Sequence, residues 1–189
     1  MKQLALVAAL AACLTTAAPA WAQKVRLATS MGDIVLQLDA EKAPKTVANF
    51  VQYVKAGHYN GTVFHRVMDG FMIQGGGMTA DMQEKPTRAP IALEASNGLS
   101  NLRGSVAMAR TMAANSATAQ FFVNVGDNLR LDAANSPDGN GYAVFGKVID
   151  GMDVVDRIKA VAVGGKAGHQ NVPVQTILIK QATLIGETK

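Results

Sequence analysis

Along residues 25–38, apolar and polar positions alternate, and a polar turn at residues 30–33 interrupts the alternation. The apolar positions are Val25, Leu27, Ile34, Leu36 and Leu38. A period of two is typical of strands that bury one side, because successive side chains point to opposite faces of a sheet. The pattern therefore predicts a β-hairpin near the start of the folded region.

Two later segments instead place apolar residues three and four positions apart, as on one face of a helix. The first contains Val47, Phe50, Val51 and Val54. Pro44 stands in its first turn and Gly57 follows its last apolar residue, which are common helix boundaries. The second contains Met152, Val155 and Ile158 and predicts a helix over residues 152–160.

The rest of the chain consists of short β-type segments separated by glycine-containing and polar loops. These segments are residues 62–67, 71–74, 105–109, 121–125, 142–148 and 174–182. Strands and helices do not alternate regularly, so the fold is predicted to be mainly β, an antiparallel barrel or sandwich capped by two helices. The longest irregular stretches are residues 78–90, 111–119 and 133–141.

The first 22 residues predict an export signal. Lys2 supplies a positive start, residues 4–14 form an apolar run, and Ala20 and Ala22 are the small residues that precede a cleavage site. The run is shorter than the ~20 residues that a membrane-spanning helix needs. We expect cleavage after Ala22, which leaves one domain over residues 23–189.

Residues 10–13 offer an alternative, because Leu-Ala-Ala-Cys resembles a bacterial lipobox that would leave Cys13 as a lipid anchor. The whole chain has 189 residues, a net charge of +4, one Cys and one Trp, and the Cys and Trp are Cys13 and Trp21. After cleavage at Ala22, the mature protein would have no disulfide and no thiol chemistry.

The charged and polar residues exclude several classes of site. Without Lys2 the charge falls to +3 and forms no basic cluster with interleaved aromatic residues, so nucleic-acid binding is not predicted. His58, His65 and His169 lie at no metal-ligand spacing. No Gly-x-Ser-x-Gly motif is present, and the glycines at 75–77 lack the Lys-Ser/Thr of a phosphate loop, which favours a turn or close backbone packing instead.

Arg66 is the unusual residue of the β segments. Strand alternation places it on the same face as Phe64, two residues before it. In the next segment the alternation places Phe71 and Ile73 on one face and Met72 and Gln74 on the other, subject to a bulge at the glycines. A guanidinium group among apolar residues is costly unless it meets acceptors or holds a carbonyl group of a ligand. The alternative is an arginine whose stem merely lies along apolar surface.

Together, these segments resemble the cyclophilin family of peptidyl-prolyl isomerases. The resemblance rests on FHRV at 64–67, GFMIQGG at 70–76, SVAMA at 105–109, SATAQFFV at 116–123 and AVFGKV at 143–148, and extends over residues 25–185. NLRG at 101–104 and MAR at 108–110 are most similar to exported bacterial members. The resemblance implies a closed eight-stranded antiparallel barrel capped by two α-helices.

It also implies isomerisation of X-Pro bonds without a cofactor or metal, in unfolded or flexible proline-containing polypeptides of the periplasm, by a monomer that does not insert into the membrane. The catalytic residues would be Arg66, Gln74 and Phe71. The substrate-binding residues would be Met72, Ala109, Arg110, Gln120, Phe122, Leu131 and Tyr142. Ala109 and Arg110 would act through their backbone. A non-catalytic peptide-binding module or holdase, and a barrel that carries a small ligand, are the alternatives.

The chain departs from the family pattern at three positions. Arg110 replaces an Asn, Tyr142 stands near a family His, and Arg130 stands where many members have a Trp. Because that Trp supports binding of cyclosporin, we expect weak binding of the drug. Titration of cyclosporin against isomerase activity tests this expectation, and potent inhibition would contradict it.

Overall fold

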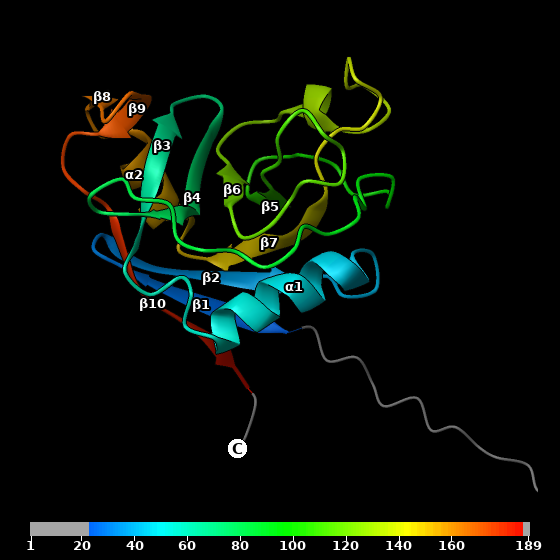
Figure 1. Ribbon diagram of the computed structural model, residues 1–189, viewed down its shortest axis with the longest axis horizontal. Coiled ribbons are helices and arrows are strands. Elements are labelled where there is room, and N and C mark those ends of the chain that lie inside the picture. Colours follow the sequence, from blue (N-terminus) through cyan, green and yellow to red (C-terminus); the bar gives the residue numbers. More distant parts are fainter. Residues whose placement is uncertain (1–22, 187–189) are drawn as a thin grey trace, which may run out of the picture.

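The computed structural model describes residues 23–186, so the predicted signal segment, with Cys13 and Trp21, lies outside the described residues. Eight strands form a closed antiparallel barrel in the order β1-β10-β3-β4-β6-β5-β7-β2 (Figure 1). They are β1 (Lys24–Thr29), β2 (Gly32–Leu38), β3 (Thr62–Met68), β4 (Met72–Thr79), β5 (Ser105–Met108), β6 (Phe121–Asn124), β7 (Val144–Asp150) and β10 (Leu178–Ile185). This architecture confirms the predicted fold class. Within residues 23–186, no helix is long and apolar enough to cross a membrane.

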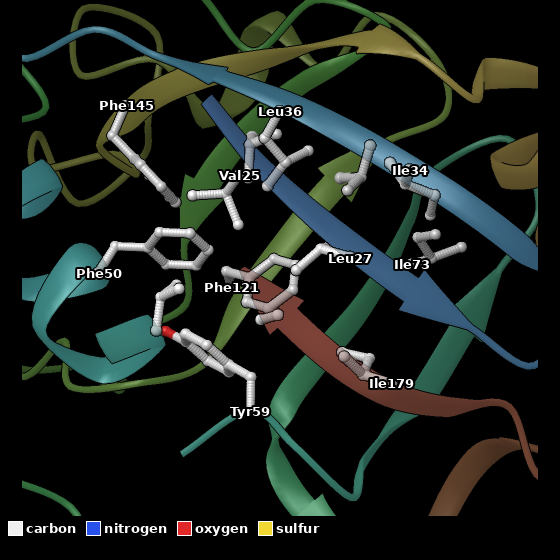
Figure 2. Packing of buried hydrophobic residues seen from close by; sticks show 14 of the residues in the cluster. Val25, Leu27, Ile34, Leu36, Phe50, Tyr59, Ile73, Phe121, Phe145 and Ile179 are labelled. Atoms are coloured by element: carbon white, nitrogen blue, oxygen red, sulfur yellow. The ribbon is translucent and has the colours of Figure 1, made fainter. Parts of the chain in front are cut away.

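The predicted hairpin is formed by β1 and β2, with Val25 opposite Leu36 and Leu27 opposite Ile34. These four side chains are fully buried inside the barrel. Figure 2 shows them converging with side chains from β4, β6 and β10. Side chains therefore fill the interior, which argues against the small-ligand carrier.

Both predicted helices are present, as α1 (Pro44–Lys55) and α2 (Met152–Lys159). Phe50 of α1 points into the barrel, where its ring centroid lies 5.5 Å from that of Phe121 and 5.0 Å from that of Phe145 (Figure 2). The cap residue of α1, Ala43, offers no side-chain acceptor. Instead, the Glu94 carboxylate accepts hydrogen bonds from the first amides of the helix and stabilises its positive end.

The prediction missed one hairpin and misplaced several boundaries. β8 (Val163–Lys166) and β9 (His169–Pro173) form a separate two-stranded sheet, in a region where the glycine-rich, exposed sequence has no alternating pattern. The last barrel strand begins at Leu178 rather than at Val174, which is exposed. In α2 the buried residues are Val154, Val155 and Ile158, so Val154 rather than Met152 completes the buried stripe.

Candidate active site

Arg66 lies on the outer face of the barrel, and the prediction that it shares a face with Phe64 is wrong. Phe64 pairs with Gly75 on β4, whereas Arg66 pairs with Gln74, so two steps along β3 match one step along β4. This irregularity is a β-bulge, and a bulge reverses the faces of the residues beyond it. Phe64 and Val67 therefore both enter the interior, while Arg66 points outward.

Phe71 also departs from simple alternation. It precedes β4, and its amide donates to the carbonyl of Met68 in the turn that Gly70 forms at φ +70°. Because Phe71 is not part of the strand, it packs with Met72 on the outer face, while Ile73 is buried in the interior. The predicted placement of Phe71 and Ile73 on one face is therefore wrong, and the structure brings Phe71 toward the face that carries Arg66.

A chain of hydrogen bonds orients the Arg66 guanidinium group. Its Nη1 donates to Gln74 Oε1 at 3.3 Å, and its Nη2 lies 3.2 Å from the Met68 sulfur. Gln74 Nε2 in turn donates to Gln120 Oε1 at 2.9 Å. The two glutamine bonds fix the direction of both side-chain amides. Arg66 is held by neutral acceptors, so its full charge and its other N–H donors remain available to a bound molecule.

Gly77 on β4 has no side chain, and Gln120 occupies the space that a side chain at this position would fill. An added Cβ at this position would lie 2.4 Å from Gln120 Cγ and 2.6 Å from its Nε2. No side chain larger than hydrogen fits without moving the whole Gln120 side chain. The glycines at 75–77 lie within β4 and serve close packing, which is one of the two roles that the sequence predicts, rather than a turn.

We expect Gly77→Ala to lower kcat/KM for an X-Pro peptide by up to about 100-fold, because displacement of a positioning group by about 1 Å can cost that much. The measurement is a peptide isomerisation assay. Gly164→Ala is the matched control, because a Cβ there would meet nothing nearer than Val174 at 4.0 Å. Equal losses in the two variants would contradict a specific role for the space beside Gln120.

His65, within the bulge, is buried, and its Nδ1 has no hydrogen-bond partner among the described residues. Burial lowers the pKa of His65 from 6.5 to about 4, because the charged imidazolium loses its solvation. The side chain is therefore neutral at pH 7. Its contribution to stability is complete above pH 6.5 and is lost as the pH falls from 6.5 toward 4, where the unfolded chain binds a proton that the folded chain does not.

We expect the free energy of unfolding to fall by about 3 kcal/mol over that pH range through His65 alone. The pKa of His58 is also lowered by burial, so His58 adds to the same trend. Urea denaturation at a series of pH values measures the effect. The slope of this free energy against pH should become shallower in His65→Gln. An unchanged slope in His65→Gln would contradict the assignment.

Beside Arg66, the outer face of the barrel carries an apolar cluster, which we call the outer-face cluster. Its buried members are Met72, Ala107, Phe122 and Val144, and its half-buried members are Met68, Phe71, Leu99, Ala109, Leu131 and Tyr142. The Phe122 and Tyr142 rings meet edge to face, with centroids 5.8 Å apart. The cluster therefore has a buried floor and a rim of partly exposed side chains, a common arrangement in sites that bind apolar groups.

A buried asparagine network holds two members of this rim. Asn128 Nδ2 donates to the Phe71 carbonyl at 2.8 Å and to Asn124 Oδ1 at 2.7 Å. Asn128 directly precedes the short 3-10 helix η1 (Leu129–Leu131), and the Leu131 amide donates to the Asn128 carbonyl. One side chain thus links the segments of Phe71 and Leu131. The sequence analysis missed this network, because isolated asparagines in loops are usually turn residues.

Arg110 directs its side chain at the 133–141 loop, although the residue as a whole is half-buried. Only 3% of the side chain is exposed, so the exposed part is backbone. Its Nε donates to the Gly141 carbonyl at 2.7 Å, its Nη2 pairs with Asp138 at 2.5 Å, and the guanidinium lies 4.7 Å from the Tyr142 ring centroid. Arg110 therefore holds the 133–141 loop and Tyr142 in place. This orientation is consistent with the prediction that Arg110 acts through its backbone.

Asp138 is the carboxylate of this contact and was not singled out in the sequence. It accepts hydrogen bonds from Ser136 and Arg110 and from the amides of Asn140 and Gly141, and these bonds hold the pKa of its carboxyl well below the usual range. The Ser-Pro-Asp-Gly sequence at 136–139 is a turn motif, which was the available signal.

The structure thus gathers nearly all the predicted residues around one patch. The Arg66–Gln74–Gln120 chain borders it, Phe71, Met72, Ala109, Phe122, Leu131 and Tyr142 form it, and Arg110 supports it from behind. A hollow of about 530 Å³ between the end of β2 and the 99–105 segment shares Leu99 and Val144 with the outer-face cluster, but none of the predicted site residues lines it. Within residues 23–186, no three His, Cys, Asp or Glu side chains are grouped as metal ligands.

The closed eight-stranded barrel with two helices, together with the hydrogen-bonded series Arg66–Gln74–Gln120, defines the class to which the protein belongs. The chain belongs to the cyclophilin family, because residues 24–184 match the family described as cyclophilin type peptidyl-prolyl cis-trans isomerase/CLD. It is therefore an enzyme of the peptidyl-prolyl isomerase class.

Individual relatives agree with this membership. The chain is 58% identical to peptidyl-prolyl cis-trans isomerase cyp18 of Streptomyces antibioticus, over 86% of this chain and 98% of that protein. It is 52% identical to peptidyl-prolyl cis-trans isomerase A of Dickeya dadantii, over 91% and 92%. A solved cyclophilin-type isomerase of Cryptosporidium parvum has a TM-score of 0.72 at 26% identity, covering 89% of this chain and 100% of that one. The same protein has also been solved in the presence of the dipeptide Ala-Pro.

Proposed function

We propose that the protein accelerates cis-trans isomerisation of X-Pro bonds in unfolded or flexible exported polypeptides, and that it needs no cofactor. The observation that carries the proposal is the placement of Arg66 beside the outer-face cluster, oriented by Gln74 and Gln120. A proline ring is apolar and a prolyl carbonyl is a hydrogen-bond acceptor, so the two parts of the site match the two parts of such a substrate.

The physical problem is the barrier to rotation about the X-Pro amide, about 18–20 kcal/mol, which arises from C–N resonance. No bond breaks, so the reaction needs no nucleophile or proton transfer to a side chain. Twisting the amide localises the lone pair on the prolyl nitrogen. A donor that meets this lone pair stabilises the transition state more than the planar ground state, and this difference is what lowers the barrier.

In this mechanism the proline ring packs on the rim formed by Phe71, Leu131 and Tyr142, over the floor formed by Met72 and Phe122. Packing removes water from the ring and lowers the local dielectric constant, which strengthens the interaction with Arg66. The Arg66 N–H donors then anchor the prolyl carbonyl and meet the prolyl nitrogen. The exposed backbone of Ala109 and Arg110 aligns the extended polypeptide.

The compartment follows from the predicted signal at residues 1–22 and is the periplasm in this proposal, with a monomer as the active species. Fractionation of cells, with mass analysis of the N-terminus, tests it. A periplasmic protein that begins at Gln23 is the expected result. A cytoplasmic protein that retains residues 1–22 would overturn the proposal, and a lipidated Cys13 would replace the free form with an anchored one.

A folding role has its own test. The protein should shorten the slow, proline-limited refolding phase of an exported protein, a phase that takes tens to hundreds of seconds without catalysis. Refolding kinetics with and without the enzyme measure this effect. An unchanged slow phase, with active enzyme on short peptides, would restrict the function to flexible segments of folded proteins.

A further inference from the structure

Three arginines surround the outer-face cluster, and they differ in how their charges are compensated. Arg110 pairs with the Asp138 carboxylate. Arg66 contacts only neutral groups, the Gln74 amide and the Met68 sulfur. The Arg130 side chain makes no hydrogen bond or ion pair with any residue in the range 23–186. Its guanidinium group instead contacts an aromatic ring.

That ring belongs to Phe71, a rim residue of the cluster. The Arg130 guanidinium carbon lies 4.9 Å from the Phe71 ring centroid, within the range of a favourable cation–π contact. The neighbouring Leu131 is itself part of the cluster, and Arg130 is exposed. The contact therefore holds a solvent-accessible positive charge at the edge of the proposed substrate site.

The carboxylates nearest to Arg130 in sequence are engaged elsewhere. Asp132 Oδ1 accepts from the amide and the side chain of Asn101, at 2.7 and 2.9 Å. Asp127 Oδ1 accepts from the Arg103 amide at 2.9 Å. Both side chains are thus directed at the 101–103 loop rather than at Arg130. Three arginines away from the site have carboxylate partners, in the pairs Arg26–Asp33, Arg103–Asp156 and Arg157–Asp153. Arg88 lies over the Tyr53 ring, as Arg130 lies over that of Phe71, but its guanidinium also donates to the Gln52 side chain.

We propose that Arg130 is a specificity-determining residue that selects substrates with an acidic side chain next to the proline. The inference rests on the proposed isomerase function of the same site. A carboxylate on the bound polypeptide would supply the partner that the chain itself does not provide, whereas a basic side chain would be repelled. Because the pair would be exposed to solvent, the expected preference for an acidic over a basic neighbour is about two- to five-fold in kcat/KM.

The test measures kcat/KM for peptides with Glu or Lys placed either directly before or directly after the proline, together with an uncharged Ala-Pro peptide. In the wild type, the Glu/Lys ratio at one of the two positions should exceed one and should fall at high salt. Arg130→Gln should bring this ratio close to one, and Arg130→Glu should reverse it. Because the readout is a ratio within one variant, a general loss of activity does not imitate the effect.

Lys180→Glu is the matched control, since it makes the same change in net charge at an exposed position on β10, outside the site. Its ratio should equal that of the wild type. An unchanged ratio in Arg130→Glu, or equal shifts in Arg130→Glu and Lys180→Glu, would overturn the proposal. Wild-type protein that fails to isomerise the uncharged peptide would instead overturn the proposed function, so the two failures are distinguishable.

Discussion

Arg66→Ala is expected to lower kcat/KM for isomerisation of a short X-Pro peptide by about 100- to 1,000-fold, the loss typical when one transition-state donor is removed. The reason is that Arg66 carries the only cationic donors that the Gln74–Gln120 chain orients toward the outer-face cluster. The effect should fall mainly on kcat, because the apolar rim still binds proline. A protease-coupled or NMR exchange assay measures the rates.

Two further variants make the result specific. Arg66→Lys keeps the positive charge but loses the planar fork of donors, so it should recover only a small part of the activity. Arg26→Ala removes an exposed arginine that pairs with Asp33 and lies outside the site, and it should retain wild-type rates. Equal rates for Arg66→Ala and wild type would refute the mechanism. If the wild type and Arg66→Ala both bind proline-containing peptides and neither accelerates isomerisation, the protein is a holdase.

Phe50→Ala is expected to lower the free energy of unfolding by about 3–5 kcal/mol. Phe50 is fully buried, and its ring packs with those of Tyr59, Phe121 and Phe145, so truncation leaves a cavity between α1 and the barrel (Figure 2). Such a loss is a large part of the 5–15 kcal/mol that stabilises a typical domain. Urea denaturation at pH 7 gives the value.

Lys45→Ala is the control for this change, because Lys45 lies on the same helix with its side chain exposed. It should alter the free energy of unfolding by less than about 0.5 kcal/mol. A loss of stability in Phe50→Ala similar to that in Lys45→Ala would contradict the role of the Phe50 ring as a core contact.

Phe121 also connects this interior packing to the site, since it directly follows Gln120 and precedes Phe122 on β6.

The sequence predicted which residues gather around the outer-face cluster better than it predicted their arrangement. Arg66 could be singled out because a permanent charge in an apolar segment requires a reason, and the family resemblance supplied its partners Gln74 and Gln120. Which way Arg66 points could not be read from spacing. The bulge in β3 depends on pairing with β4, where the close-packed glycines and the bulky Phe64 must fit together.

Arg110 and Asp138 show the same limit. The chain separates them by 28 residues, and a buried arginine finds its carboxylate only after the barrel brings β5 next to β7 and the 133–141 loop. Local sequence patterns do not predict such a pair. The asparagine network under Phe71 was missed for a related reason, since Asn128 and Phe71 lie 57 residues apart in the chain and meet only in the folded barrel.

By itself, the sequence determined the first hairpin, both helices and most of the barrel strands, because the periods of two and 3.6 are local consequences of backbone geometry. It also provided the chemical groups that gather around the outer-face cluster, namely a charged donor fork, two amides and apolar side chains. Only the tertiary structure decided the outward face of Arg66, the packing of Phe71 on the outer face, and the position of Arg130 over the Phe71 ring without a carboxylate partner in residues 23–186. Each depends on contacts between distant segments, which a closed barrel forms and a local pattern does not encode.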